Sequence, residues 1–145
     1  MFEAGDHMMR SFVLNIDKLF ESFVARWLQA RLRREGLGVE LQYGFNLQHL
    51  EFKVDILIKD GDGKAIAVLD TKYKDADKPR QDDVSQVVTY ALANNCSDAI
   101  LVYPSPVTMP LDSVMRDIRV RSLVFNLDSI PLDDAGEALI HCLFH

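Results

Sequence analysis

Three residues near the middle of the chain have types and spacing that suit hydrolysis of a phosphodiester bond. Asp70 and Lys72 lie two residues apart in a segment that reads as a β-strand, so their side chains share one face. Asp55, in the preceding strand-like segment, supplies a second carboxylate. Two carboxylates can share a hard divalent cation such as Mg²⁺, which prefers oxygen ligands. A lysine beside that cation can orient or deprotonate the attacking water and neutralise charge at the phosphate.

The turn between the two segments decides whether Asp55 reaches the face of Asp70. Residues 60–63 read Asp-Gly-Asp-Gly, a strong signal for a β-hairpin turn. A tight turn here pairs residue 60 with 63, and therefore 55 with 68. Asp55 is then the diagonal neighbour of Asp70, roughly 7–8 Å away between backbones. A loop of odd length would shift the register by one and place Asp55 on the opposite face.

The Asp-x-Lys pattern alone is weak evidence, because short motifs often occur by chance and alternating charges on a strand usually form a solvated face. The preceding residues strengthen it. Residues 66–69 are Ile-Ala-Val-Leu, apolar on both faces, which predicts an interior strand. Charged side chains at the end of an interior strand need a partner or a function. We therefore interpret Asp55, Asp70 and Lys72 as a candidate active centre, with a solvated strand end as the alternative.

Two expected helices carry polar residues that bear on this centre. Gln86 and Tyr90 are four residues apart and share one helical face beside the apolar stripe. They either complete the centre or form an ordinary polar flank. Glu21 lies at the edge of the apolar stripe of the first helix, where a solvated glutamate is the simpler interpretation.

Hydrophobic periodicity predicts the elements that position these residues. The expected helices are residues 15 to about 34 and 82–95, and the expected strands are 39–47, 51–59, 64–72, 98–103 and 118–127. Residues 1–14 are expected to form a loose lead-in, and 73–81 a loop. The order predicts an α/β fold, a three-layer sandwich with a mixed sheet flanked by helices. The strands on either side of the second helix are expected to run parallel through a right-handed crossover.

The first helix is the clearest of these elements. Gly36 and Gly38 are expected to end it. Trp27 is expected to lie in the core. The apolar residues that recur at helical spacing are Ile16, Leu19, Phe20, Phe23, Val24, Trp27 and Leu28.

Length and composition fit one domain, residues 1–145, with a core of about 15–127. Hydrophobic residues make up 48% of the 145 residues and charged residues 26%, as in ordinary globular proteins. No apolar run approaches the ~18 residues that span a bilayer, and no secretory signal is present, so a cytoplasmic protein without a membrane partner is expected. Cys96 and Cys142 have no metal-binding spacing and are expected to be free thiols.

The net charge of −6 is unusual for a domain that binds DNA by itself, because phosphate contacts need Lys and Arg. Bound divalent cations reverse the local charge at a carboxylate site, so DNA is not excluded. The acidic balance indicates that a partner or another domain holds most of the DNA. The cluster Lys74, Lys78 and Arg80 either contacts the DNA backbone or belongs to a solvated loop.

The candidate residues occur in an order that resembles a known family. The matching segments are Leu19-Phe20-Glu21, Val54-Asp55, Leu69-Asp70-Thr71-Lys72-Tyr73, Gln86 with Tyr90, and Val102-Tyr103-Pro104. Together they resemble the catalytic domain of the McrC subunit of modified-cytosine-dependent restriction endonucleases, over about residues 11–127. The Asp-Thr-Lys-Tyr segment with the Gln-x-x-x-Tyr helix is fairly specific.

This resemblance implies a PD-(D/E)xK fold and DNA cleavage that depends on Mg²⁺, for which Mn²⁺ can substitute. It implies that Asp55 and Asp70 bind the metal, that Lys72 activates water, that Glu21 assists at the metal and that Gln86 steadies the site. Tyr90 is expected to contact DNA. The implied partner is a GTP-hydrolysing AAA+ motor subunit of the McrB type.

Two other functions remain open at this point. The chain is either a self-sufficient nuclease of the same fold, of the resolvase or repair kind, acting as a homodimer, or a non-catalytic assembly module. A dimer would show concentration-dependent activity without a nucleotide. Divalent metal titration separates the assembly module from both nucleases.

Overall fold

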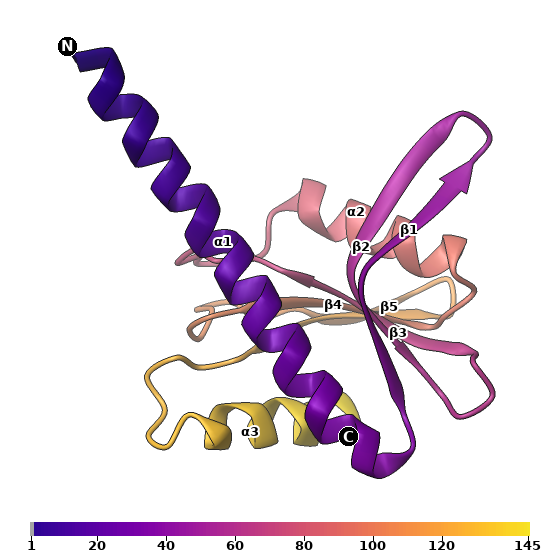
Figure 1. The fold of residues 1–145 in the computed structure, drawn as a ribbon. Helices are drawn as coiled ribbons and strands as arrows, with labels where there is room; N and C mark the ends of the chain where they lie inside the picture. Colours follow the sequence, from indigo (N-terminus) through magenta and orange to yellow (C-terminus); the bar gives the residue numbers. More distant parts are fainter. Residues whose placement is uncertain (1) are drawn as a thin grey trace.

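Helices and strands alternate along the chain in the manner of an α/β protein. The computed structural model describes residues 2–145, with the side chains of residues 15–46 and 48–145 (Figure 1). The helices are α1 (Phe2–Leu32), the 3-10 helix η1 (Arg33–Glu35), α2 (Gln81–Ala93) and α3 (Asp133–Leu143). The strands are β1 (Gly38–Leu47), β2 (Leu50–Lys59), β3 (Ala65–Thr71), β4 (Asp98–Tyr103), β5 (Asp112–Met115) and β6 (Ile118–Val124).

Within the described residues, one mixed sheet contains all six strands in the order β1-β2-β3-β4-β6-β5. β3, β4 and β6 are parallel, and the other neighbouring pairs are antiparallel. α1 and α3 pack on one face of the sheet and α2 on the other (Figure 1). The predicted three-layer α/β sandwich is confirmed, as is the parallel pairing of the strands on either side of α2.

α1 is longer than the sequence predicts. The helix has 31 residues and begins at Phe2, so the expected loose lead-in is wrong for residues 2–14. These residues contain no proline, and adding turns to an established helix is much easier than nucleating one. The predicted end is confirmed, because Gly36 has a left-handed backbone with φ 77°. Within the described residues, no helix is long and apolar enough to cross a bilayer.

Only part of the apolar stripe of α1 reaches the core. Phe20, Val24 and Leu28 are buried, but Leu19 is 67% exposed and Phe23 is 42% exposed. The apolar periodicity of this helix is therefore wider than its buried face. α1 rests on the sheet along one narrow line, so flanking apolar positions face solvent. Trp27 is half-buried and its Nε1 donates a hydrogen bond to Asp133 Oδ1 at 2.8 Å.

Two elements, β5 and α3, have no counterpart in the sequence prediction. β5 forms an antiparallel pair with β6 at the edge of the sheet. α3 packs Ala135, Leu139 and Leu143 into the same core as α1. The buried guanidinium of Arg121 ties α3 to the sheet, because it donates to the carbonyl oxygens of Cys142 at 2.7 Å and Leu143 at 3.2 Å.

We expect Gly136→Ala to destabilise the fold by about 1–3 kcal/mol, because its added methyl group overlaps the indole ring of Trp27. Gly136 is buried between α3 and α1 and leaves no room for a side chain. Gly38→Ala is the control, because its methyl group meets open space. Urea denaturation of both variants tests this, and equal stabilities would show that the contact relaxes without cost.

The hairpin of β2 and β3 has a different register from the predicted one. Leu57 pairs with Val68 and Ile56 with Leu69, whereas the prediction paired 55 with 68. The Asp60 amide donates to the carbonyl of Lys64 at 2.9 Å, so three residues form the loop instead of two. A bulge beside Ile58 and Lys59 adds a second one-residue shift. The total shift of two preserves the alternation of the paired residues, because Ile56 and Ile58 face α1 and Leu57 faces α2. The alternation breaks at Asp55, because Val54 faces the α2 side as Leu57 does.

Candidate active site

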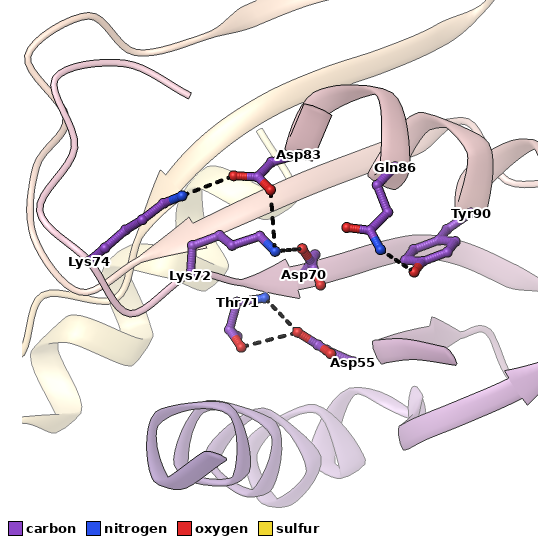
Figure 2. Close-up of polar contacts among 8 residues, drawn as sticks. All are labelled: Asp55, Asp70, Thr71, Lys72, Lys74, Asp83, Gln86 and Tyr90. Carbon is purple, nitrogen blue, oxygen red and sulfur yellow. Dashed lines mark hydrogen bonds and ion pairs between the residues drawn. The ribbon is translucent and has the colours of Figure 1, made fainter. Parts of the chain in front are cut away.

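Asp55 lies where β2 separates from β3. The paired register ends at Ile56 and Leu69, and continuing it by one residue places Asp55 opposite Asp70. Asp55 Oδ2 accepts hydrogen bonds from the Thr71 amide at 3.0 Å and from Thr71 Oγ1 at 3.2 Å (Figure 2). The carboxylate therefore binds a backbone amide of β3 beyond the last paired residues of β2. This anchors the half-buried Asp55 at the carboxyl end of β3.

Asp70 is almost fully buried at the same strand end, with 5% of its surface exposed. Lys72 Nζ lies 2.8 Å from Asp70 Oδ2 (Figure 2). The contact gives this oxygen a charged partner, but the oxygen accepts no hydrogen bond of good geometry. A buried carboxylate oxygen without such a bond is available to a further positive ligand.

Asp70 and burial perturb the ionisation of Asp55. Burial and the negative charge of Asp70 raise the pKa of Asp55 to about 8. Burial alone would lower the pKa of Lys72, but the ion pair with Asp70 outweighs it and raises that pKa. Lys72 is therefore an ammonium ion at neutral pH, whereas Asp55 still holds its proton. Acidic side chains held together in this way are typical of functional sites.

In the absence of metal, we expect the free energy of unfolding to fall as the pH rises from about 4 to about 8. Asp55 ionises near 3.8 when unfolded and at about 8 when folded. Across this window the folded state keeps a proton that the unfolded state has released, so stability is lost as the pH rises. Urea denaturation in a chelator at several pH values tests this. Asp55→Asn is the control, and an unchanged pH slope in that variant would contradict the assignment to Asp55.

Asp83, in the first turn of α2, completes an ion-pair network that the sequence did not predict. Its Oδ1 lies 3.5 Å from Lys72 Nζ, and its Oδ2 lies 3.1 Å from Lys74 Nζ (Figure 2). Burial raises the pKa of Asp83, but the two lysines outweigh burial and lower it. In the sequence, Asp83 has only the features of an acid near a helix start, and no local pattern links it to Lys72. It holds both lysines at the end of β3.

Gln86 and Tyr90 on α2 face the same region. Gln86 Nε2 lies 2.6 Å from the Tyr90 hydroxyl oxygen, to which it donates a hydrogen bond (Figure 2). Tyr90 is only 5% exposed and packs edge-on against Phe45 and Phe52 of the β1–β2 hairpin. This burial argues against the predicted DNA contact of Tyr90. Its hydroxyl instead fixes the amide of Gln86 beside the carboxylates.

Glu21 approaches the site from α1. Its Oε1 accepts a hydrogen bond from Gln42 Nε2 at 2.9 Å, and its charge contributes to the raised pKa of Asp55. Among the side chains that the structure describes, no three acids, histidines or cysteines lie close enough to form a metal-binding group. The structure thus brings Asp55 and Asp70 together and leaves Glu21 near them, outside the closest pair.

The predicted basic cluster lies in the loop between β3 and α2. Lys74 is engaged by Asp83, whereas Lys78 and Arg80 are exposed. The loop is fixed to the segment after β4, because Ser105 Oγ donates to Asp75 Oδ1 at 2.8 Å and the Met109 amide donates to the Asp77 carbonyl at 2.7 Å. The exposed lysine and arginine are therefore held on a defined loop beside the site.

The residues present fit a divalent cation. Two carboxylates lie together, one buried oxygen accepts no hydrogen bond, and all the donors are hard oxygen atoms. A bound cation would offset the cost of burying the Asp55 carboxylate and its repulsion from Asp70, which together raise the pKa of Asp55. Asp55 and Asp70 would hold it, with Glu21 nearby.

Comparison with known proteins identifies the family. The family model described as McrBC 5-methylcytosine restriction system component matches residues 1–104. The chain belongs to the McrBC family. The match covers α1, α2 and the first four strands, with every residue of the candidate site. The McrC-type resemblance is thereby confirmed, and the chain is a component of a 5-methylcytosine restriction system. A search of curated proteins gives no match.

Proposed function

We propose that this McrBC-family chain is the DNA-cleaving module of its restriction system, a Mg²⁺-dependent endonuclease of the PD-(D/E)xK type. The observation that carries the proposal is the apposition of Asp55 and Asp70 at the end of β3, with Lys72 2.8 Å from Asp70. Carboxylates and a lysine in this arrangement suit phosphodiester hydrolysis. Mn²⁺ is expected to substitute for Mg²⁺, because both accept oxygen ligands.

Each residue of the site has a distinct part in this reaction. Asp55 and Asp70 bind the cation, which supplies positive charge that acidifies water and stabilises the attacked phosphate. Lys72 orients the attacking water and neutralises charge that develops on the phosphate oxygens. Asp83, whose Oδ1 lies 3.5 Å from Lys72 Nζ, would keep Lys72 at the strand end with a cation bound to Asp70. Gln86, held by Tyr90, donates hydrogen bonds from the α2 side.

The DNA path follows from the basic side chains near the site. Lys78 and Arg80 are exposed on the loop after β3 and suit contacts with phosphate oxygens. The chain as a whole carries a charge of −6, so these few contacts give weak binding. We therefore propose that a GTP-hydrolysing AAA+ partner of the McrB type retains the DNA while this chain cuts it.

Nicking of supercoiled plasmid by the purified chain tests the proposal directly. We expect relaxation of the plasmid in Mg²⁺ or Mn²⁺ and none in a chelator. The Lys72→Ala variant, purified in the same way, controls for contaminating nucleases. If the chain stays inactive even with its motor partner, DNA and GTP, and binds no divalent metal, an assembly role replaces the proposed one.

A further inference from the structure

Gln42 has an unusual backbone conformation in the middle of β1. Its φ is 49°, in the left-handed region that residues other than glycine rarely adopt, and least often within a strand. The side chain is exposed, so packing does not impose this conformation. A strained residue that persists without a packing reason points to a functional constraint.

The position of Gln42 in the sheet is also distinctive. Leu41 pairs with Ile56 and Tyr43 with Val54, so Gln42 stands opposite Asp55, and the pairing is interrupted at that point. The interruption lies at the place where β2 separates from β3. Gln42 of β1 and Asp55 of β2 therefore lie at the same irregularity of the sheet.

The side chain of Gln42 connects this irregularity to α1. Its Nε2 donates a hydrogen bond of 2.9 Å to Glu21 Oε1. Glu21 is half-buried and lies near Asp55, on the helix that precedes β1. An exposed glutamate side chain samples many rotamers, and a fixed donor restricts them. In this fold, Gln42 supplies that donor from the strand opposite Asp55.

We infer that Gln42 is a positioning residue, which fixes the carboxylate of Glu21 at the edge of the cation site formed by Asp55 and Asp70. The inference rests on the proposed function. Glu21 lies outside the closest pair of acids, which suits contact with a cation through water, since Mg²⁺ keeps several of its waters. Residues that orient carboxylates around a metal contribute to its affinity although they do not touch it.

The variant Gln42→Gly separates this role from a structural one. Glycine adopts a left-handed φ without strain, so the urea midpoint of the metal-free protein should stay equal or rise. Removing the donor should weaken Mn²⁺ binding, measured by calorimetry, by about tenfold or more. Gln48→Gly is the matched control, because Gln48 is also a glutamine with a left-handed φ, 55°, and lies exposed in the turn between β1 and β2. It should leave Mn²⁺ binding unchanged.

A double-mutant cycle with Glu21→Ala shows whether Gln42 acts through Glu21. If it does, the double variant binds Mn²⁺ as weakly as Glu21→Ala alone. Wild-type affinity in Gln42→Gly would overturn the inference, and so would additive losses in the double variant. A merely structural role would lower the urea midpoint and give additive effects.

The same titrations distinguish this inference from the proposed function. Asp70→Ala is measured in parallel. Loss of Mn²⁺ binding in this variant, together with plasmid nicking by the wild-type chain, supports the cation site itself. If Asp70→Ala fails to bind while Gln42→Gly binds normally, only the role of Gln42 is rejected. If the wild-type chain binds no Mn²⁺, the proposed function and the inference fail together.

Discussion

Asp70→Asn should abolish metal-dependent cleavage and leave the fold intact. The change keeps the shape of the side chain but removes one of two charges that bind the cation. Losing a residue that merely orients a metal ligand costs about 10–100-fold, so losing a ligand should cost more than about 100-fold. The metal-free protein should stay folded, because the lost ion pair with Lys72 at 2.8 Å is offset by relief of the charge that raises the pKa of Asp55.

Plasmid nicking at saturating Mn²⁺ and urea denaturation in a chelator measure the two halves of this prediction. Asp62→Asn is the control, because Asp62 is an exposed acid in the β2–β3 turn. The assignment of Asp70 is wrong if Asp70→Asn cuts at the wild-type rate. A variant that neither cuts nor folds would show that Asp70 is needed for structure.

Lys72→Ala should lower the maximal cleavage rate by about 10²–10³-fold, the usual cost of removing one group that stabilises charge in the transition state. Mn²⁺ affinity should change far less, because the two carboxylates remain. Removing Lys72 leaves Asp83 paired with Lys74 at 3.1 Å, so the first turn of α2 keeps a partner. Single-turnover rates and calorimetric Mn²⁺ affinity measure the two effects separately.

Lys72→Arg distinguishes the two parts proposed for this lysine. Arginine keeps the positive charge but replaces the compact ammonium with a larger planar group. Recovery of the rate in this variant assigns charge neutralisation to Lys72, whereas a rate as low as that of Lys72→Ala assigns orientation of the attacking water. A large loss of Mn²⁺ affinity with a normal maximal rate would contradict both parts.

The sequence predicts the central elements of the fold well, because their patterns are strong and local. β2 alternates apolar and polar residues, β3 contains a short apolar run, and α2 has an apolar stripe between a proline-containing loop and a buried strand. Their observed bounds lie within a few residues of the predicted ones. The α/β order follows from these elements alone.

The β2–β3 register was predicted wrongly, although the alternation of its paired residues was predicted correctly. The sequence Asp-Gly-Asp-Gly favours a turn but does not fix the number of residues in the loop. The extra loop residue and the bulge beside Lys59 each shift the register by one. Because side-chain direction has a period of two, the shifts cancel for the face and move Asp55 directly opposite Asp70.

Exposure and long-range packing were harder to predict. α3 was missed although Ala135, Leu139 and Leu143 recur at helical spacing, since Gly136 inside the helix weakens the local helix signal. Leu19 fits the apolar stripe of α1 but faces solvent, since periodicity does not give the width of the contact.

The residues of the candidate site also differ in whether local sequence patterns predict them. Asp55, Asp70 and Lys72 were predictable because two strands and one turn relate them. Asp83 and Gln42 were not, because their partners come from other elements. The ion pair of Asp83 with Lys72 needs the docking of α2 on the sheet, and the left-handed φ of Gln42 has no sequence signal.

The buried Arg121 guanidinium has a practical consequence for anyone who trims this protein. Its two carbonyl partners belong to Cys142 and Leu143, far beyond the family match and beyond the core predicted from sequence. A fragment that stops near residue 127 keeps the guanidinium but loses those acceptors. The guanidinium would then keep only Asp98, whose Oδ1 lies 3.6 Å from Arg121 Nη2, and the core that α3 shares with α1 would be uncovered. A fragment that keeps the candidate site and this packing therefore extends through the end of α3.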